Sequence, residues 1–132
     1  MKTVLENATE ILLLLFLIIT FLQSGLDKVL DWKGNLSWLK AHFSKSPLHG
    51  LVTGMLAIVL VCEVLAGLFC LIGLVQIMFA TNGHMAFYGA ILSCVSLLML
   101  LFGQRMAKDY EGAKTIVIYL IPAIFLVFLL QH

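Results

Sequence analysis

The chain has 132 residues, of which 62% are hydrophobic and 11% are charged, and its mean hydropathy is +1.09. Soluble domains carry about 25% charged residues and cannot hide this much apolar surface, so the composition predicts a protein whose solvent is lipid. The net charge of +1 provides no basic face for nucleic acid, which excludes that class of partner. One membrane domain over residues 1–132 accounts for the whole length.

The first apolar segment predicts a membrane-spanning helix over about residues 8–30. A secretory signal peptide is not indicated, because two glutamates precede the apolar core and no small-residue cleavage site follows it. Lys28 and Asp31 lie three positions apart where this helix leaves the hydrocarbon. That spacing predicts an ion pair on one face of the helix.

Residues 35–43 predict a short amphipathic helix, because three apolar residues recur there at helical spacing. Either Asn35 or Ser37 is expected to cap its N-terminus. We expect this helix to lie in the membrane interface. The alternative is a re-entrant lid over the helices.

Three further apolar runs follow Pro47, and Gly50 and Gly54 in the first of them form a GxxxG pattern that predicts a helix-packing seam. A charged loop over residues 104–114 is expected before the last run. The predicted spans are residues 48–79, 85–102 and 115–130. With the first span they predict an all-α, antiparallel four-helix bundle, because short loops join antiparallel neighbours.

Seven of the eight Lys and Arg residues lie at the end of the first span or in the loops after the first and third spans, and the opposite side holds only Lys2. Basic loops stay in the cytoplasm. The sequence therefore predicts that both termini lie outside the cytoplasm.

Glu63 places a carboxylate near the middle of the second span. Such a group costs a few kcal/mol in the bilayer, so it should face the interior of the bundle. Counting residues from the helix ends puts other polar side chains at a similar depth, and we predict that Glu63 forms a cluster with Thr20, Ser93, Ser96 and Tyr119. Three roles fit this cluster: an interhelical hydrogen bond that locks the bundle, a proton-accepting or quinone-binding site, or a contact with a partner helix.

No catalytic residue is predicted. The four histidines lie away from the middle of the spans, and no two share a helix face at ligand spacing, so neither a metal site nor a haem site is expected. Cys62, Cys70 and Cys94 are expected to be small buried apolar residues. We therefore expect no enzymatic activity from the chain on its own.

Two segments carry a family resemblance. The first reads FLQSGLDKVLD from Phe21 and contains an S-G-x-x-K-x-x-D pattern, formed by Ser24, Gly25, Lys28 and Asp31. The second reads EVLAGLFCLIG from Glu63 and contains a glutamate followed by two spaced glycines, Gly67 and Gly73. In this order and spacing they resemble the first two helices of the DoxX family, and the similarity covers about residues 12–73.

The resemblance implies a bacterial four-helix inner-membrane protein associated with quinone-linked oxidoreductases. Some members are small subunits of terminal quinol oxidase or thiosulfate–quinone oxidoreductase complexes. The expected function is that of an accessory subunit of such a complex, with a quinone as the implied cofactor and other subunits or further copies as partners. The alternatives are an assembly or scaffold protein that binds another membrane protein and, third, a carrier of a small solute or a proton. The family pattern assigns no catalytic role to the motif residues.

Overall fold

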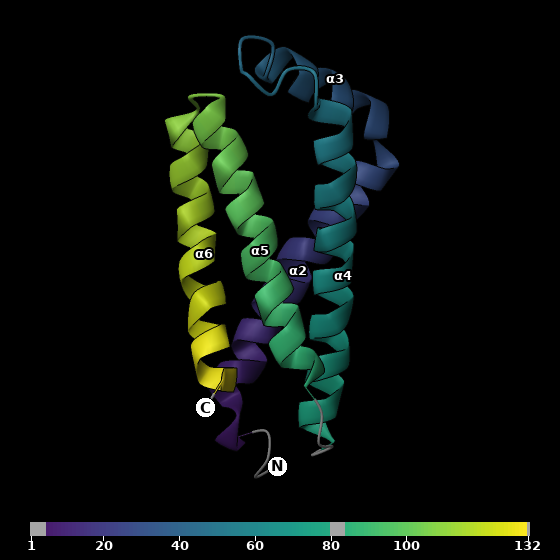
Figure 1. The fold of residues 1–132 in the computed structure, drawn as a ribbon. Helices are drawn as coiled ribbons and strands as arrows, with labels where there is room; N and C mark the ends of the chain where they lie inside the picture. The colour runs from purple at the N-terminus through teal and green to yellow at the C-terminus, as the bar shows by residue number, and fades with distance from the viewer. Residues whose placement is uncertain (1–4, 80–83, 132) are drawn as a thin grey trace.

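The computed structural model describes residues 5–79 and 84–131. The helices, in chain order, are α2 (Ala8–Leu30), α3 (Trp32–His42), α4 (Val52–Met78), α5 (Met85–Met106) and α6 (Tyr110–Gln131). All but α3 are long and apolar enough to cross a membrane. These four alternate in direction and pack side by side, while the short α3 lies across one end (Figure 1). The all-α four-helix bundle with a short helix between the first two spans is confirmed, and the described residues contain no strand.

The helix α2 has the predicted bounds, but α3 begins three residues earlier than predicted. Asp31 is the reason: its Oδ1 accepts a hydrogen bond from the backbone N–H of Gly34 at 3.2 Å and so caps the helix. The predicted caps, Asn35 and Ser37, are wrong. The Asn35 side-chain amide instead donates to the backbone carbonyl of Asp31 at 2.8 Å.

The helix α4 begins at Val52, later than predicted, because a turn at Ser46 intervenes. The Ser46 hydroxyl accepts a hydrogen bond from the N–H of Leu48 at 3.1 Å, which holds the chain out of helical geometry. Gly50 therefore lies in this turn rather than on α4. A Cβ added to Gly50 or Gly54 would meet no atom within 4 Å, so the predicted GxxxG seam is not formed within the described chain.

The predicted charged loop is mostly helical, and only residues 107–109 separate α5 from α6. Lys108 turns the chain with a φ of 60° in the left-handed region. Asp109 then starts α6, because its Oδ1 accepts a hydrogen bond from the N–H of Gly112 at 2.9 Å. The helix α6 continues through Pro122 without interruption.

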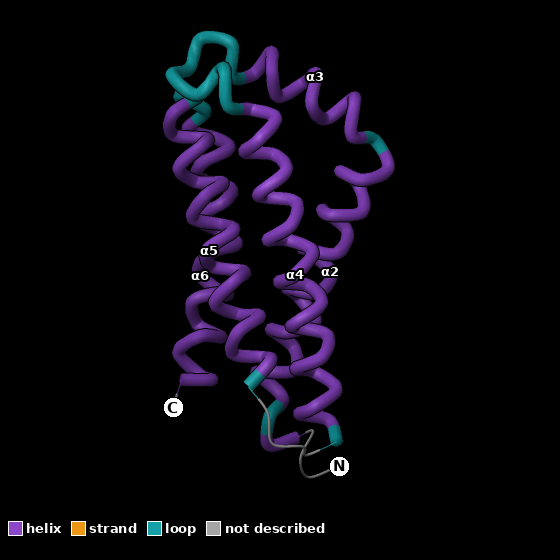
Figure 2. The backbone as a smooth tube through the Cα atoms, turned by 45° about the vertical axis from the view of Figure 1, so that its right-hand side comes forward, coloured by secondary structure: helices purple, strands orange, loops and turns teal. Residues whose placement is uncertain are grey.

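Small residues bring α5 close to α4 at the end of the bundle that lies opposite α3. A Cβ added to Gly73 would overlap the backbone of Ala86, and one added to Gly89 would lie 2.7 Å from the backbone nitrogen of Cys70. The helix α5 also packs along α6, and α2 packs along α4. By contrast α2 makes few contacts with α6. In the view of Figure 2, α5 and α6 lie on one side of α4 and α2 lies on the other.

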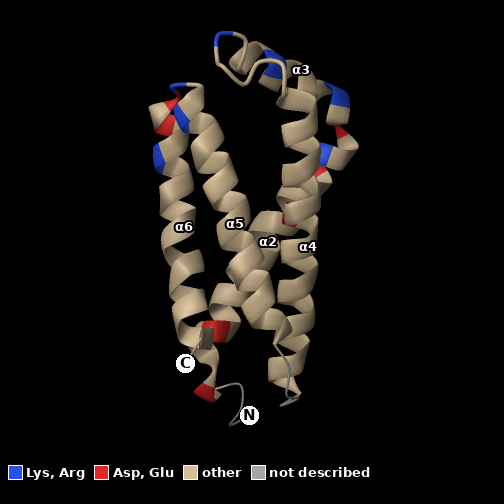
Figure 3. Ribbon diagram, in the orientation of Figure 1, with Lys and Arg blue, Asp and Glu red and all other residues tan. Residues whose placement is uncertain are grey.

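The two ends of the bundle differ in their charged residues. Within the described residues every Lys and Arg lies toward the end covered by α3 and the α5–α6 turn (Figure 3), whereas Lys2 falls outside them. Glu10 lies in the first turn of α2, which begins at the opposite end, where α6 also finishes. Large apolar side chains such as Ile19, Ile58 and Ile118 cover the outside of the helices. This surface requires a lipid environment, and the chain is a multi-pass integral membrane protein with four candidate spans.

Candidate functional site

Glu63 is the charged residue that lies deepest in the bundle. It is only 1% exposed and projects from α4 toward the interior. It lies eleven positions after Val52, the first residue of α4, which places it about 16 Å along the helix at 1.5 Å per residue. A carboxylate at this depth needs a compensating partner.

That partner is Lys28 on α2. Its Nζ lies 3.0 Å from Oε1 of Glu63, and the side chains are 16% and 2% exposed, respectively. The same ammonium donates a hydrogen bond to the hydroxyl of Ser24 at 2.6 Å. The predicted ion pair between Lys28 and Asp31 is wrong, because Lys28 points into the bundle and Asp31 caps α3.

The local sequence explains why these groups meet. Ser24 and Lys28 are four residues apart, so they share one face of α2. Gly25 lies beside them, and a Cβ there would be 2.9 Å from Cγ2 of Val64, the residue that follows Glu63. The missing side chain thus lets α2 approach α4 where the ion pair forms. The two segments that resemble the DoxX family are in direct contact in the fold.

A cleft of about 490 Å³ opens beside the ion pair. We name it the α2/α6 cleft. It is lined by Phe16, Ile19, Thr20, Gln23, Ser24, Asp27, Glu63, Leu97, Leu100, Ile116 and Tyr119. The cleft is partly open at the side of the bundle, where the exposed apolar side chain of Ile19 lines it. Its most buried polar side chain is Glu63.

The structure brings together three of the five residues that the sequence placed in one polar cluster. Thr20, Glu63 and Tyr119 line the α2/α6 cleft, and Ser93 and Ser96 do not. The Ser93 hydroxyl donates to the backbone carbonyl of Gly89 at 2.8 Å. The Ser96 hydroxyl is fully buried and has no hydrogen-bond partner. Residues at the same depth in the membrane therefore need not belong to the same site. Their depth does not determine which side of α5 they face.

Sequence reasoning missed the polar stripe on α2 that forms one wall of the cleft. Its members recur at helical spacing and are Thr20, Gln23, Ser24 and Asp27. A second signal was also available. Lys28 is the only basic residue within the four predicted spans, and a buried carboxylate requires a partner.

The cleft combines an aromatic wall with polar groups. The rings of Phe16 and Tyr119 stack between α2 and α6, with centroids 5.9 Å apart and planes 20° apart. The Oε1 atom of Glu63 contacts the ammonium of Lys28 but has no hydrogen bond of suitable geometry. The cleft therefore places aromatic rings, hydroxyl groups and a carboxylate on the walls of one cavity. No group of three or more His, Cys, Asp or Glu side chains suited to a metal ion occurs among residues 5–79 and 84–131.

Fold and site together define a multi-pass membrane protein whose helical bundle holds a buried ion pair beside a lateral cleft. Comparisons of the chain with protein-family models, with curated proteins and with solved structures find no match. The DoxX resemblance therefore stays a prediction from the sequence.

Proposed function

We propose that this protein is a DoxX-like accessory subunit of a quinone-linked membrane redox complex and that the α2/α6 cleft receives the quinone head group. The observation that carries the proposal is the buried Lys28–Glu63 pair beside a cleft that opens to lipid. An ion pair that only holds two helices together needs no cavity beside it. A solute that reaches the ion pair from the bilayer does need such a cavity.

The residues of the cleft fit such a head group. A quinone presents a flat ring with carbonyl oxygens, which require hydrogen-bond donors. The hydroxyls of Thr20 and Tyr119 and the side-chain amide of Gln23 supply donors within one cleft, and Phe16 supplies an aromatic face. Ligand sites in proteins generally combine apolar walls with a few polar groups in this way.

A bound quinone would supply the capacity to take up electrons and protons, and this chain would supply the binding groups. The Glu63 carboxylate lines the cleft, and its Oε1 contacts the Lys28 ammonium at 3.0 Å. Lys28 fixes the side-chain position of Glu63 and provides positive charge. Electrons would come from a partner subunit.

Native mass spectrometry of the gently solubilised protein, incubated with a short-chain ubiquinone analogue, tests this proposal. We expect one bound quinone, and we expect Glu63→Gln and Tyr119→Phe each to lower its occupancy at least five-fold. The matched control is Ile118→Val on the lipid-facing side of α6, which should leave occupancy unchanged. The absence of binding, or occupancy that is equal in all variants, would overturn the proposal.

The DoxX resemblance implies a bacterial inner-membrane location, and the charge distribution supports an orientation with the α3 end in the cytoplasm and both termini outside it. All described Lys and Arg residues lie toward that end. A cysteine added at the C-terminus, in a chain whose three native cysteines are replaced by alanine, should react with an impermeant maleimide in intact cells. Protection of that thiol until the cells are lysed would reverse the orientation.

An assembly protein is the second candidate function. It is favoured by the open surface of α4 around Gly54, where an added Cβ would meet nothing within 4 Å. Co-purification of a non-redox membrane protein without any quinone would support this candidate. A Gly54→Leu variant should then release that partner.

A further inference from the structure

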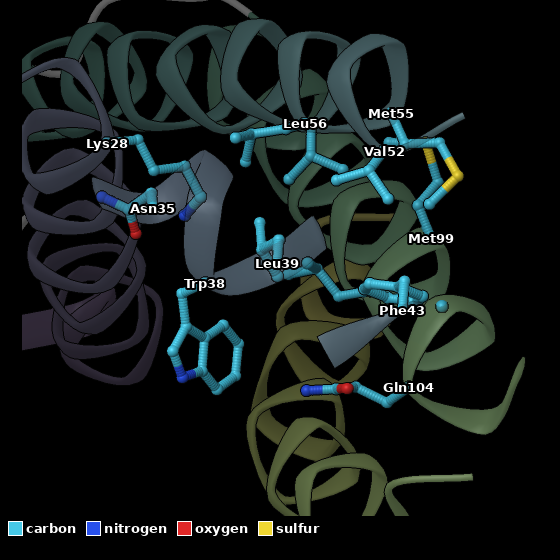
Figure 4. A pocket seen from close by; sticks show the side chains of 13 residues that line it. Lys28, Asn35, Trp38, Leu39, Phe43, Val52, Met55, Leu56, Met99 and Gln104 are labelled. Atoms are coloured by element: carbon cyan, nitrogen blue, oxygen red, sulfur yellow. The ribbon is translucent and has the colours of Figure 1, made fainter. Parts of the chain in front are cut away.

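A second cavity lies under α3, separate from the α2/α6 cleft. This α3 chamber has a volume of about 250 Å³, is partly open to the surface, and lies between α3 on one side and α4 and α5 on the other (Figure 4). Its lining residues are mostly apolar and include Trp38, Leu39, Phe43, Leu56 and Met99. The polar side chains Lys28 and Asn35 lie together at one end of the chamber, and Met55 and Met99 lie at the other.

The α3 chamber continues into a groove on the membrane-facing surface. This α4/α5 groove has a volume of about 430 Å³ and is lined only by apolar residues and a glycine, which are Met55, Ile58, Val59, Val95, Leu98, Met99, Phe102 and Gly103. Four of these residues, Met55, Val59, Met99 and Gly103, also line the chamber. An apolar path therefore leads from the lipid, past two flexible methionines, to Lys28.

Lys28 retains binding capacity at the inner end of this path. An ammonium has three N–H donors. Ser24 accepts one at 2.6 Å, and Glu63 faces another at 3.0 Å. The third donor is free for an acceptor in the chamber that Lys28 lines. Glu63 lines the α2/α6 cleft and not this chamber, so the ion pair lies between the two cavities.

We propose that the α3 chamber and the α4/α5 groove together bind a long-chain fatty acid, with its carboxylate at Lys28 and its alkyl chain along the groove. Charge complementarity supports an acidic head group. Lys33 and Lys40 are exposed on α3, and basic residues predominate at this end of the bundle. The narrow chamber and the single apolar groove suit one chain rather than the two chains of a phospholipid. This site does not depend on the quinone proposal.

Trp38 allows a direct test, because it lines the chamber and Trp32 is the only other tryptophan in the chain. In a Trp32→Phe protein in neutral detergent, dibromostearate should quench Trp38 emission in a saturable manner. The methyl ester of the same acid should bind at least ten-fold more weakly. Lys28→Gln should remove this difference, and Met99→Phe, which fills the path but keeps the charge, should weaken binding of the acid.

Ile118→Phe, on the lipid-facing side of α6, is the matched control and should leave quenching unchanged. Equal quenching by the acid and its methyl ester would mean ordinary partitioning and would overturn the proposal. Equal quenching by a dibrominated phosphatidylcholine would overturn it too, in favour of a two-chain lipid. If Lys28→Gln fails to fold by circular dichroism, Met99→Phe decides, because undiminished binding in that variant contradicts the proposed path.

Discussion

The two ends of the bundle are packed by opposite means. At the end opposite α3, glycines let backbones touch: Gly73 meets Ala86, and Gly89 meets Cys70. Toward α3, α5 diverges from α4 (Figure 1), and cavities lie on either side of the Lys28–Glu63 pair. This difference in packing means that the closely packed end can hold the helices in place while the α3 end remains open for ligands. The predictions below test that division.

The largest effect is expected at the closely packed end. In Gly73→Ala the new methyl group would overlap the backbone of Ala86, which cannot move aside as a side chain can. We expect the free energy of unfolding to fall by about 3 kcal/mol, the upper part of the range for overpacking. Reversible unfolding in mixed detergent micelles measures this. A loss as small as that of an ordinary surface substitution would show that α4 and α5 are not in backbone contact.

The next effect is expected at the ion pair. Lys28→Met leaves the carboxylate of Glu63 buried without its partner, so stability should fall by about 2 kcal/mol. The estimate is below the value for fully buried pairs because Lys28 is 16% exposed. The same unfolding assay measures it, with Lys33→Met as the control on the exposed face of α3. Equal stability of the two variants would mean that Lys28 is not engaged in the bundle.

A smaller effect is expected where α3 meets the α5–α6 turn. His42 Nε2 lies 3.1 Å from Oε1 of Gln104 and 3.4 Å from Oδ2 of Asp109, and its ring stacks on Trp38 with centroids 4.7 Å apart. His42→Phe keeps an aromatic ring and removes the polar contacts, and it should cost about 1 kcal/mol. Trp38 emission should shift to longer wavelength if α3 loosens over the chamber. An unchanged spectrum and unchanged stability would show that His42 does not hold α3.

The smallest effect is expected on the open surface of α4. Gly54→Ala adds a methyl group that meets nothing within 4 Å and replaces a flexible residue inside a helix. Stability should rise by about 0.5 kcal/mol. Gly54→Ala and Gly73→Ala both replace a glycine of α4 by alanine, so the two variants differ only in what surrounds the added methyl group. A large loss from Gly54→Ala would reveal a contact between copies of the chain.

Most of the fold could be predicted from the apolar runs, because their length and order alone determine four spans. The bounds of α2 were predicted correctly for that reason. The start of α4 and the α5–α6 turn were not, because each depends on one side-chain hydrogen bond. Ser46 delays α4, and Asp109 starts α6 early. A hydropathy pattern carries no information about such local bonds.

The candidate site was predictable in part. The burial of Glu63 followed from the cost of a carboxylate in lipid, and the structure agrees with it. Its pairing with Lys28 was missed because a lysine at a helix end ordinarily extends to the membrane surface. Ser93 and Ser96 were grouped with Glu63 by depth, and the rotation of α5 places them elsewhere. Depth can be read from a sequence, whereas helix rotation depends on packing partners.

The most direct test of the central claim, that Lys28 and Glu63 form a coupled pair between two cavities, is a double-mutant cycle. Lys28→Met, Glu63→Gln and the double variant would be unfolded reversibly in mixed micelles. We predict that the double variant is less destabilised than the sum of the single variants, with a coupling of about 2 kcal/mol. A coupling below about 0.5 kcal/mol, the additive behaviour of independent sites, would contradict the account.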